Sequence, residues 1–167
     1  MTTASSISLP DPNTLCEVLI QDIKRTLPRD TLIVGIRTGG VLVAERIRTA
    51  LAPDMPLGML DISFYRDDFA RIGLHPQVKP TTLPFDIADR TILLVDDVLF
   101  TGRTIRAAMN ELFDWGRPAR ILLAVLIDRH AKEVPLAADY IGAVIETALT
   151  DDIQLTEDSE GHLKLAI

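Results

Sequence analysis

The chain has 167 residues, of which 47% are hydrophobic and 25% charged, and its formal net charge is −7 at pH 7. This composition argues against global disorder, and the length fits a single domain over residues 1–167. The acidic charge argues against a general nucleic-acid binder, because Lys and Arg provide most non-specific affinity for phosphates. With one cysteine, no apolar run long enough to span a bilayer and no signal-peptide pattern, we expect a cytoplasmic protein.

The first half of the chain predicts two helices and two strands. A helix is predicted over residues 12–27, because Asp11 is a good N-cap, proline follows it, and apolar residues recur with helical spacing. Residues 31–36 are a β-branched run that predicts a strand. The strand ends in the turn RTGG, after which residues 40–51 have helical spacing. Residues 56–65 predict a second strand.

A polar, proline-bearing segment follows Tyr65 and has no sustained hydrophobic period. Structureless segments of this length are uncommon inside compact domains, and most are functional lids or disordered. We therefore expect residues 66–84 to form a flexible lid loop.

The second half predicts further strands around one helix. Strands are predicted over residues 91–95 and 121–127, with a helix over 105–113 between them, and 140–145 and 163–167 predict edge strands. The long strands are apolar on both faces, which is typical of a parallel sheet covered on both sides. The fold class is therefore α/β. The acidic stretch TDDIQLTEDSE is expected at the surface.

The stretch LLVDDVLFTGRT contains the residues most typical of a ligand-binding site. In an open parallel sheet, ligands bind beyond the carboxyl ends of the strands, where Asp96 and Asp97 are expected. Thr101, Gly102 and Thr104 then open a helix, whose N–H groups and positive end can bind a phosphate. Carboxylates beside a phosphate would repel it unless they face sugar hydroxyls or a hydrated magnesium ion. The stretch therefore predicts a ribose-phosphate site.

This stretch resembles the phosphoribosyl-diphosphate motif of type I phosphoribosyltransferases. Together with VGIRTGG, DISFYRDD, GRPARILLAVLIDR and ADYIG, it resembles the PyrR family of bifunctional pyrimidine operon regulators with uracil phosphoribosyltransferase activity, over about residues 12–147. The resemblance implies a mainly parallel sheet flanked by helices, with a flexible hood at the predicted lid. It also implies that uracil and phosphoribosyl diphosphate react to UMP and diphosphate.

The resemblance also implies roles for individual residues. Asp96 and Asp97 would hold the ribose hydroxyls as catalytic residues, and Arg66 would reach the diphosphate from the lid. The diphosphate loop would be Arg37, Thr38, Gly39 and Gly40, with a cis peptide bond between Arg37 and Thr38. The 5′-phosphate loop would be Leu99, Phe100, Thr101, Gly102, Arg103 and Thr104. The base would be bound by Asp128, Arg129 and Ile141.

The resemblance implies that magnesium binds with the diphosphate substrate. The histidines have no metal-ligand spacing, so no metal site held by them is expected. Many family members have Arg at the position of Gly39, so one basic contact to the diphosphate is expected to be missing here. The expected partners are phosphoribosyl diphosphate, uracil and UMP, and the resemblance implies a homodimer or a higher homo-oligomer.

Two alternatives remain open. The first is an RNA-binding attenuation regulator that senses uridine nucleotides and binds a pyr mRNA leader. Lys132 is present in the segment expected to bind RNA, but Ala137 and Ala143 stand where basic residues are usual, which argues against it. The second is a purine-base phosphoribosyltransferase, since the phosphoribosyl motif does not select the base.

Overall fold

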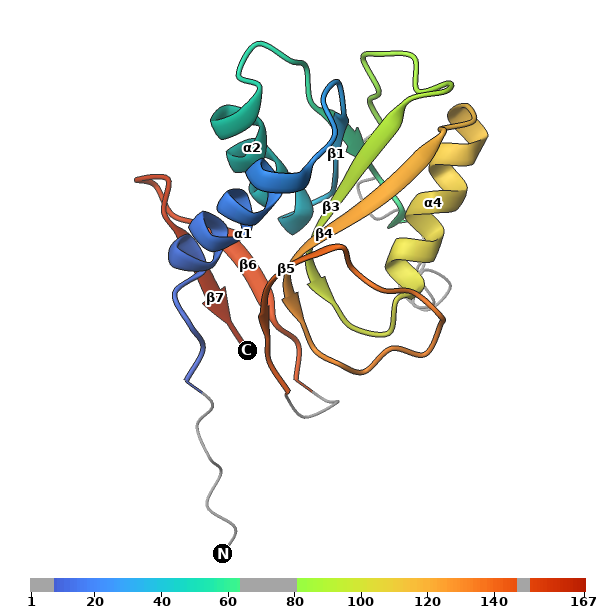
Figure 1. Cartoon of the computed structure of the whole chain (residues 1–167). Helices are drawn as coiled ribbons and strands as arrows, with labels where there is room; N and C mark the ends of the chain where they lie inside the picture. Colours follow the sequence, from blue (N-terminus) through green and yellow to red (C-terminus); the bar gives the residue numbers. More distant parts are fainter. Residues whose placement is uncertain (1–7, 64–80, 147–150) are drawn as a thin grey trace, which may run out of the picture.

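The structure is a computed structural model, and it describes residues 8–63, 81–146 and 151–167. Its centre is a five-stranded sheet in the order β2-β1-β3-β4-β5 (Figure 1), and every neighbouring pair is parallel. The predicted parallel sheet is thus confirmed. The strands are β1 (Leu32–Ile36), β2 (Gly58–Leu60), β3 (Thr91–Leu99), β4 (Arg120–Asp128) and β5 (Tyr140–Val144).

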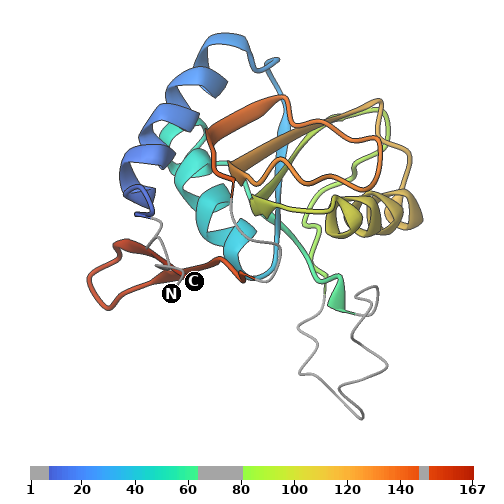
Figure 2. The same cartoon turned by 90° about the horizontal axis from the view of Figure 1, so that it is seen from below.

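Helices cover both faces of the sheet. Helices α1 (Pro12–Thr26) and α2 (Gly39–Leu51) lie on one face, and α4 (Arg103–Trp115) lies on the other (Figure 2). Asp11 begins α1 as predicted, since its side chain accepts hydrogen bonds from the backbone N–H groups of the first turn. Separate clusters of buried apolar side chains fill the two interfaces between sheet and helices. Among the described residues, no helix is long and apolar enough to cross a membrane.

The C-terminal region forms a second sheet of its own. Strands β6 (Gln154–Glu157) and β7 (Leu163–Ala166) pair antiparallel as a hairpin beside α1 and α2. The prediction of an edge strand is confirmed for β5, but it is wrong for β7, whose partner is β6. The prediction that the acidic stretch lies at the surface is also wrong in part, because Ile153 and Leu155 are each only 6% exposed.

Strands β2 and β3 differ most from their predicted bounds. Strand β2 is only three residues long, shorter than the predicted 56–65. Strand β3 continues to Leu99, beyond the predicted end at residue 95, because its pairing with β4 extends to Asp128.

Of the predicted lid, only residues 81–84 lie within the described part of the chain. They lie beside the end of β2: Thr82 pairs with Met59, and the Asp61 N–H donates to Thr81 Oγ1 at 3.0 Å. The two ends of the intervening segment are therefore held together at one edge of the sheet.

Candidate active site

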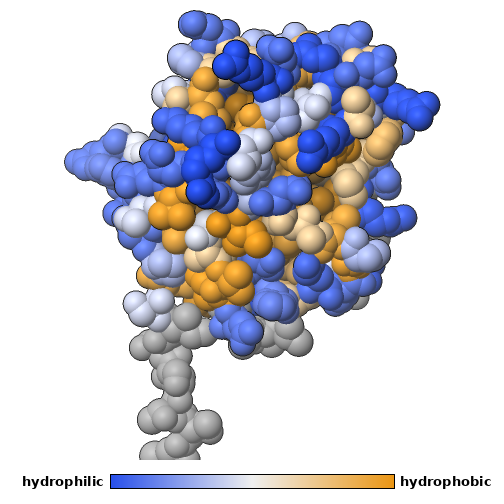
Figure 3. Space-filling model, viewed as in Figure 1, coloured by the Kyte–Doolittle hydropathy of each residue, from blue (hydrophilic) through white to orange (hydrophobic). Residues whose placement is uncertain are grey.

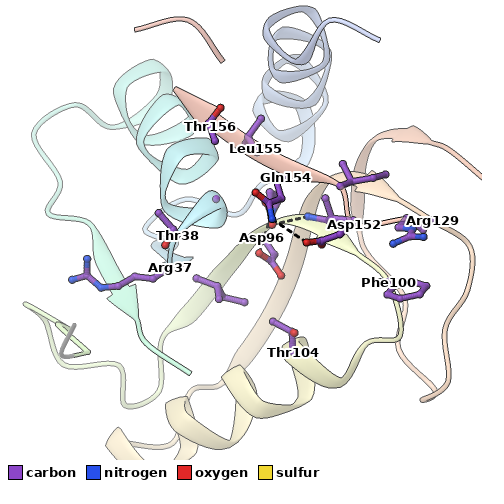
Figure 4. A pocket seen from close by; sticks show the side chains of 15 residues that line it. Arg37, Thr38, Asp96, Phe100, Thr104, Arg129, Asp152, Gln154, Leu155 and Thr156 are labelled. Atoms are coloured by element: carbon purple, nitrogen blue, oxygen red, sulfur yellow. Dashed lines mark hydrogen bonds between the residues drawn. The ribbon is translucent and has the colours of Figure 1, made fainter. Parts of the chain in front are cut away.

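A cavity of about 450 Å³ opens at the carboxyl ends of the central strands (Figure 4). Four parts of the chain meet there: the turn from β1 into α2, the end of β3 with the start of α4, the residue after β4, and strand β6. The lining residues are 36–39, 96–98, 100, 104, 129 and 152–156. This is the place where parallel sheets bind ligands.

Asp96 and Asp97 form the floor of this cavity. They lie inside β3 rather than after it, but beyond Val95, which forms the last pair of β3 with β1 by facing Gly35. The Asp97 N–H donates to Asp96 Oδ1 at 2.9 Å, and the Val98 N–H donates to Asp97 Oδ1 at 2.9 Å. Asp96 is 5% exposed. The two carboxylates thus accept hydrogen bonds from backbone N–H groups of β3 itself, beyond the last pair of β3 with β1.

The first turn of α2 lies against both carboxylates. A Cβ atom added to Gly39 would be 2.1 Å from Asp97 Oδ2, and one added to Gly40 would be 3.1 Å from Asp96 Oδ1. At Gly40 an added Cβ atom would also be 2.5 Å from the backbone oxygen of Val95, which favours glycine there, and at Gly39 a side chain would displace the Asp97 carboxylate. The positive end of α2 favours the negative charge of the two acids.

The turn before α2 contains the expected cis peptide bond between Arg37 and Thr38. The Arg37 N–H donates to the Leu60 oxygen at 2.9 Å, and its side chain extends away from Asp96 (Figure 4). Thr38 is the N-cap of α2 and makes no side-chain hydrogen bond that caps the helix. The N-terminal end of α2 is thus directed at the cavity without a side-chain cap.

A second helix N-terminus meets the cavity at Thr104 (Figure 4). Gly102 is the N-cap of α4, also without a capping side chain, and its φ of 89° is in the left-handed region that favours glycine. Of the predicted 5′-phosphate loop, Phe100 and Thr104 line the cavity, whereas Leu99 is buried in the core.

Arg103 and Thr101 of this loop do not line the cavity and make other contacts. The Arg103 guanidinium forms an exposed ion pair with Glu133 at 3.3 Å. Thr101 Oγ1 accepts from the Arg103 N–H at 3.3 Å, so its hydroxyl shapes the turn that leads into the helix.

Arg129 lies on the far side of the cavity, where it is 5% exposed. Its guanidinium carbon is 3.9 Å from the centre of the Phe100 ring, and its Nη1 donates to the Asp151 oxygen at 2.8 Å. Asp128 is buried and accepts from the His130 N–H at 2.8 Å. Ile141 lines a separate depression beside α1. Of these three predicted base-binding residues, all described, Arg129 is the one that lines the cavity.

Strand β6 is the wall that the sequence reasoning missed. Residues 152–156 line the cavity, and Gln154 Nε2 donates to Asp152 Oδ2 at 2.9 Å. The alternation of buried Ile153 and Leu155 with polar neighbours was a strand signal, but it is short and lies in an acidic context. Arg66, the predicted catalytic residue of the lid, lies outside the described residues.

Comparisons with known proteins agree with this geometry. Residues 13–157 match the family described as "Phosphoribosyl transferase domain". A protein named "Bifunctional protein PyrR" from Pseudomonas fluorescens is 46% identical, covering 95% of this chain and 97% of its own. A protein of the same name from Nitrosococcus oceani is 55% identical over a region that covers 74% of this chain and 71% of that protein.

Solved structures with this fold include a purine phosphoribosyltransferase from Pyrococcus horikoshii, with a TM-score of 0.62, 26% identity and coverage of 81% of this chain and 83% of its own. A hypoxanthine phosphoribosyltransferase from Staphylococcus aureus has a TM-score of 0.65 and 18% identity, covers 92% of this chain and 86% of its own, and supports the fold alone. The chain therefore belongs to the phosphoribosyltransferase family and, within it, to the PyrR family.

Proposed function

We propose that this phosphoribosyltransferase acts on uracil, converting uracil and phosphoribosyl diphosphate into UMP and diphosphate. The bond between the anomeric carbon and the diphosphate oxygen breaks, the bond from that carbon to uracil N1 forms, and the N1 proton leaves. The observation that carries the phosphoribosyl transfer is the pair Asp96 and Asp97, which lies in one cavity with the N-termini of α2 and α4. Two anion sites on either side of acceptors suit a sugar with a phosphate group at each end.

Each helix N-terminus would bind one of the two phosphate groups of the substrate. The 5′-phosphate would bind the start of α4, at the N–H groups of residues 99–104 and the Thr104 hydroxyl. The diphosphate would bind the turn of residues 37–40 at the start of α2. Arg66 would add a cationic contact to the diphosphate from the lid. Each helix end has unpaired N–H donors and a partial positive charge, so each favours an anion.

The carboxylates would act on the sugar between these phosphates. Asp96 and Asp97 would accept hydrogen bonds from the ribose hydroxyls and lie near the positive charge that develops on the anomeric carbon as diphosphate leaves. Catalysis would come mainly from this positioning and electrostatic stabilisation. Magnesium, bound together with the diphosphate, would neutralise part of its charge, and carboxylate oxygens such as those of Asp96 and Asp97 fit this hard cation.

Arg129 would face the nucleobase. Its guanidinium carbon lies 3.9 Å from the centre of the Phe100 ring and its Nη1 donates to the Asp151 oxygen, so the side chain is held at the cavity as a cationic donor of the kind that suits a carbonyl oxygen of uracil. Asp128 would support the turn after β4 through its bond to the His130 N–H. The choice of uracil rests on the similarity to proteins named PyrR.

Steady-state assays with uracil, hypoxanthine, guanine and orotate test the proposal. We expect turnover with uracil and little with the other bases. A purine-base activity is the second candidate, since one solved neighbour, 26% identical, is a purine phosphoribosyltransferase. Turnover with hypoxanthine or guanine and none with uracil would replace our proposal with that candidate.

A regulatory role that responds to UMP is proposed as a further function, because the relatives carry the name "Bifunctional protein PyrR". Lys132 is exposed as RNA binding would require, but its neighbour Glu133 pairs with Arg103, and the net charge of the chain is −7. Binding to a pyr leader RNA should therefore be weak and should weaken further as salt is added. No affinity at low ionic strength would remove this role.

We also propose that the chain assembles as a homodimer or a higher homo-oligomer. Val18 of α1 is 53% exposed and Val144 of β5 is 54% exposed. Figure 3 shows hydrophobic side chains gathered on the face where α1 and β5 lie, and such patches often mark interfaces. Analytical ultracentrifugation should give at least twice the 18.4 kDa mass of the chain, and the mass of a single chain at micromolar concentration would contradict this proposal.

A further inference from the structure

The β6–β7 hairpin contributes one wall of the active-site cavity, through the lining residues 154–156 of β6. In Figure 4, the segment that enters and includes most of β6 runs from Asp152, on the side of Arg129, to Thr156, on the side of Thr38. It therefore spans both the proposed base site and the proposed diphosphate site. If the hairpin moved, the cavity would lose this wall, and both substrates would lose contacts.

The hairpin needs support from outside its own sheet. Its sheet has only two strands, and an isolated two-stranded hairpin is at best marginally stable in water. Leu155 and Leu163 are 6% and 1% exposed, and they belong to the apolar cluster that lies under α1 and α2. Its attachment thus depends on these two helices.

Asn13 attaches the hairpin to α1. Its side-chain Oδ1 accepts from the Leu163 N–H at 3.0 Å, and its Nδ2 donates to the Leu163 oxygen at 3.1 Å. The amide thereby pairs with both backbone groups of one β7 residue, as a neighbouring strand would. Since Leu163 faces Glu157 in the hairpin, this pair also fixes the position of β6.

Arg46 attaches the hairpin to α2. Its Nη2 donates to the Gly161 oxygen at 2.5 Å, in the turn between β6 and β7, and its Nη1 is 3.4 Å from Glu157 Oε2. Its Nη1 also donates to the Leu42 oxygen of its own helix, which holds the guanidinium in place. The Arg46 side chain is 24% exposed, whereas its contacts with Gly161 and Glu157 lie at the surface.

We propose that Asn13 and Arg46 are positioning residues that hold the β6–β7 hairpin across the active-site cavity and so set the affinity for its substrates. Neither residue lines that cavity. The inference rests on the proposed function for the identity of the substrates. If only a fraction of the molecules has the hairpin docked, the apparent dissociation constant of each substrate is the intrinsic constant divided by that fraction. The acids of the cavity floor stay in place, because they lie on β3.

The test compares Asn13→Ala, Arg46→Gln and the double variant with matched controls. Arg48→Gln is one control, because Arg48 lies on the same helix and is 23% exposed, but it binds Glu45 and the Pro53 oxygen. Thr14→Ala is the other, because Thr14 lies beside Asn13 and binds Asp11. The measurements are kcat, KM for each substrate, the dissociation constant of phosphoribosyl diphosphate by calorimetry, and hydrogen exchange of the hairpin amides.

We expect the double variant to raise both KM values and the dissociation constant about 25-fold, because the loss of one hydrogen bond of this kind changes an equilibrium by roughly fivefold and the double variant removes the attachments of two residues. kcat should change less than about twofold, and the amides of β6 and β7 should exchange faster while those of β3 and β4 do not. The control variants should match the wild type. A purely structural role would instead lower the amount of active protein and leave KM unchanged.

An unchanged dissociation constant in a double variant whose hairpin exchanges faster would overturn the inference. So would hairpin exchange that stays at the wild-type rate. If the wild type turned over no base, the proposed reaction would fail, but calorimetry and hydrogen exchange would still test Asn13 and Arg46.

Discussion

The Asp97 carboxylate lies directly against the backbone of Gly39. A Cβ atom on Gly39 would be 2.1 Å from Asp97 Oδ2 and 2.5 Å from its Cγ, distances that real Cβ contacts do not reach. An arginine at this position could therefore be accommodated only if Asp97 moved. The basic contact expected to be missing here is thus linked to the position of the carboxylate that we propose to be catalytic, since glycine is what allows Asp97 to approach α2.

Replacing Gly39 by alanine should displace the Asp97 carboxylate. We expect turnover to fall at least tenfold, and the free energy of unfolding to fall by about 1–3 kcal/mol, as is typical for overpacked sites. In an Asp97→Ala background the same replacement should cost much less stability, because the clashing group is gone. Chemical denaturation of all four proteins measures this coupling, and losses that simply add would show that the contact is unimportant.

Asp97→Asn keeps the shape of the side chain but removes its charge. If the carboxylate stabilises positive charge on the anomeric carbon, kcat should fall about 10²-fold, which is typical for loss of one electrostatic group. The thermal unfolding midpoint should stay within a few degrees of the wild type. Asp54→Asn is the control, since Asp54 is exposed and outside the cavity. Unchanged turnover in Asp97→Asn would refute the role of the pair.

The sheet could be predicted because its strands are continuous apolar runs. Burial on both faces requires such runs, and β3 and β4 show them along most of their length. The turn at Arg37 and the acids at Asp96 could be predicted because they follow apolar runs, so that sequence order alone places them at one edge of the sheet, although the acids prove to lie inside β3. The end of β3 could not be predicted, because it depends on pairing with β4 beyond the end of β1.

The β6 wall and the place of Ile141 could not be predicted for a related reason. Only Ile153 and Leu155 mark β6, and their burial depends on α1 and α2, which lie far away in the sequence. Ile141 follows a strand pattern, but the pattern does not say whether the side chain faces the cavity. The burial of β6 and the direction of the Ile141 side chain both depend on contacts between segments that are distant in the sequence.

Cys16 should be almost unreactive in the folded protein. It is 2% exposed, and burial raises the pKa of its thiol from 9.0 to about 11. The reactive thiolate is therefore rare at pH 8, and we expect alkylation by iodoacetamide to be at least 100-fold slower than in denaturant. Equal rates in the folded and denatured protein would contradict the buried position.

The raised pKa of Cys16 also predicts a pH dependence of stability. Between pH 9 and about 11 the unfolded chain loses the thiol proton while the folded chain keeps it. The folded state then binds more protons, so the contribution of this group to stability is present below pH 9 and is lost as the pH rises through that window. Cys16→Ala should flatten this part of the stability profile, measured by denaturation at several pH values.

Replacing Arg129 by lysine should weaken binding of the base more than binding of phosphoribosyl diphosphate. Lysine keeps the charge, but it loses the planar group that stacks on Phe100 and donates to the Asp151 oxygen. We expect KM for uracil to rise about tenfold, which corresponds to roughly 1.4 kcal/mol, and KM for phosphoribosyl diphosphate to change less than about threefold.

Arg120→Lys is the matched control for this replacement, because Arg120 lies at the opposite end of the same strand and is exposed. It should leave both KM values unchanged. Equal increases of the two KM values in Arg129→Lys would mean that Arg129 supports the cavity as a whole through Asp151 and β6. An increase confined to uracil would mean that the guanidinium faces the base, because only a direct contact distinguishes one substrate from the other.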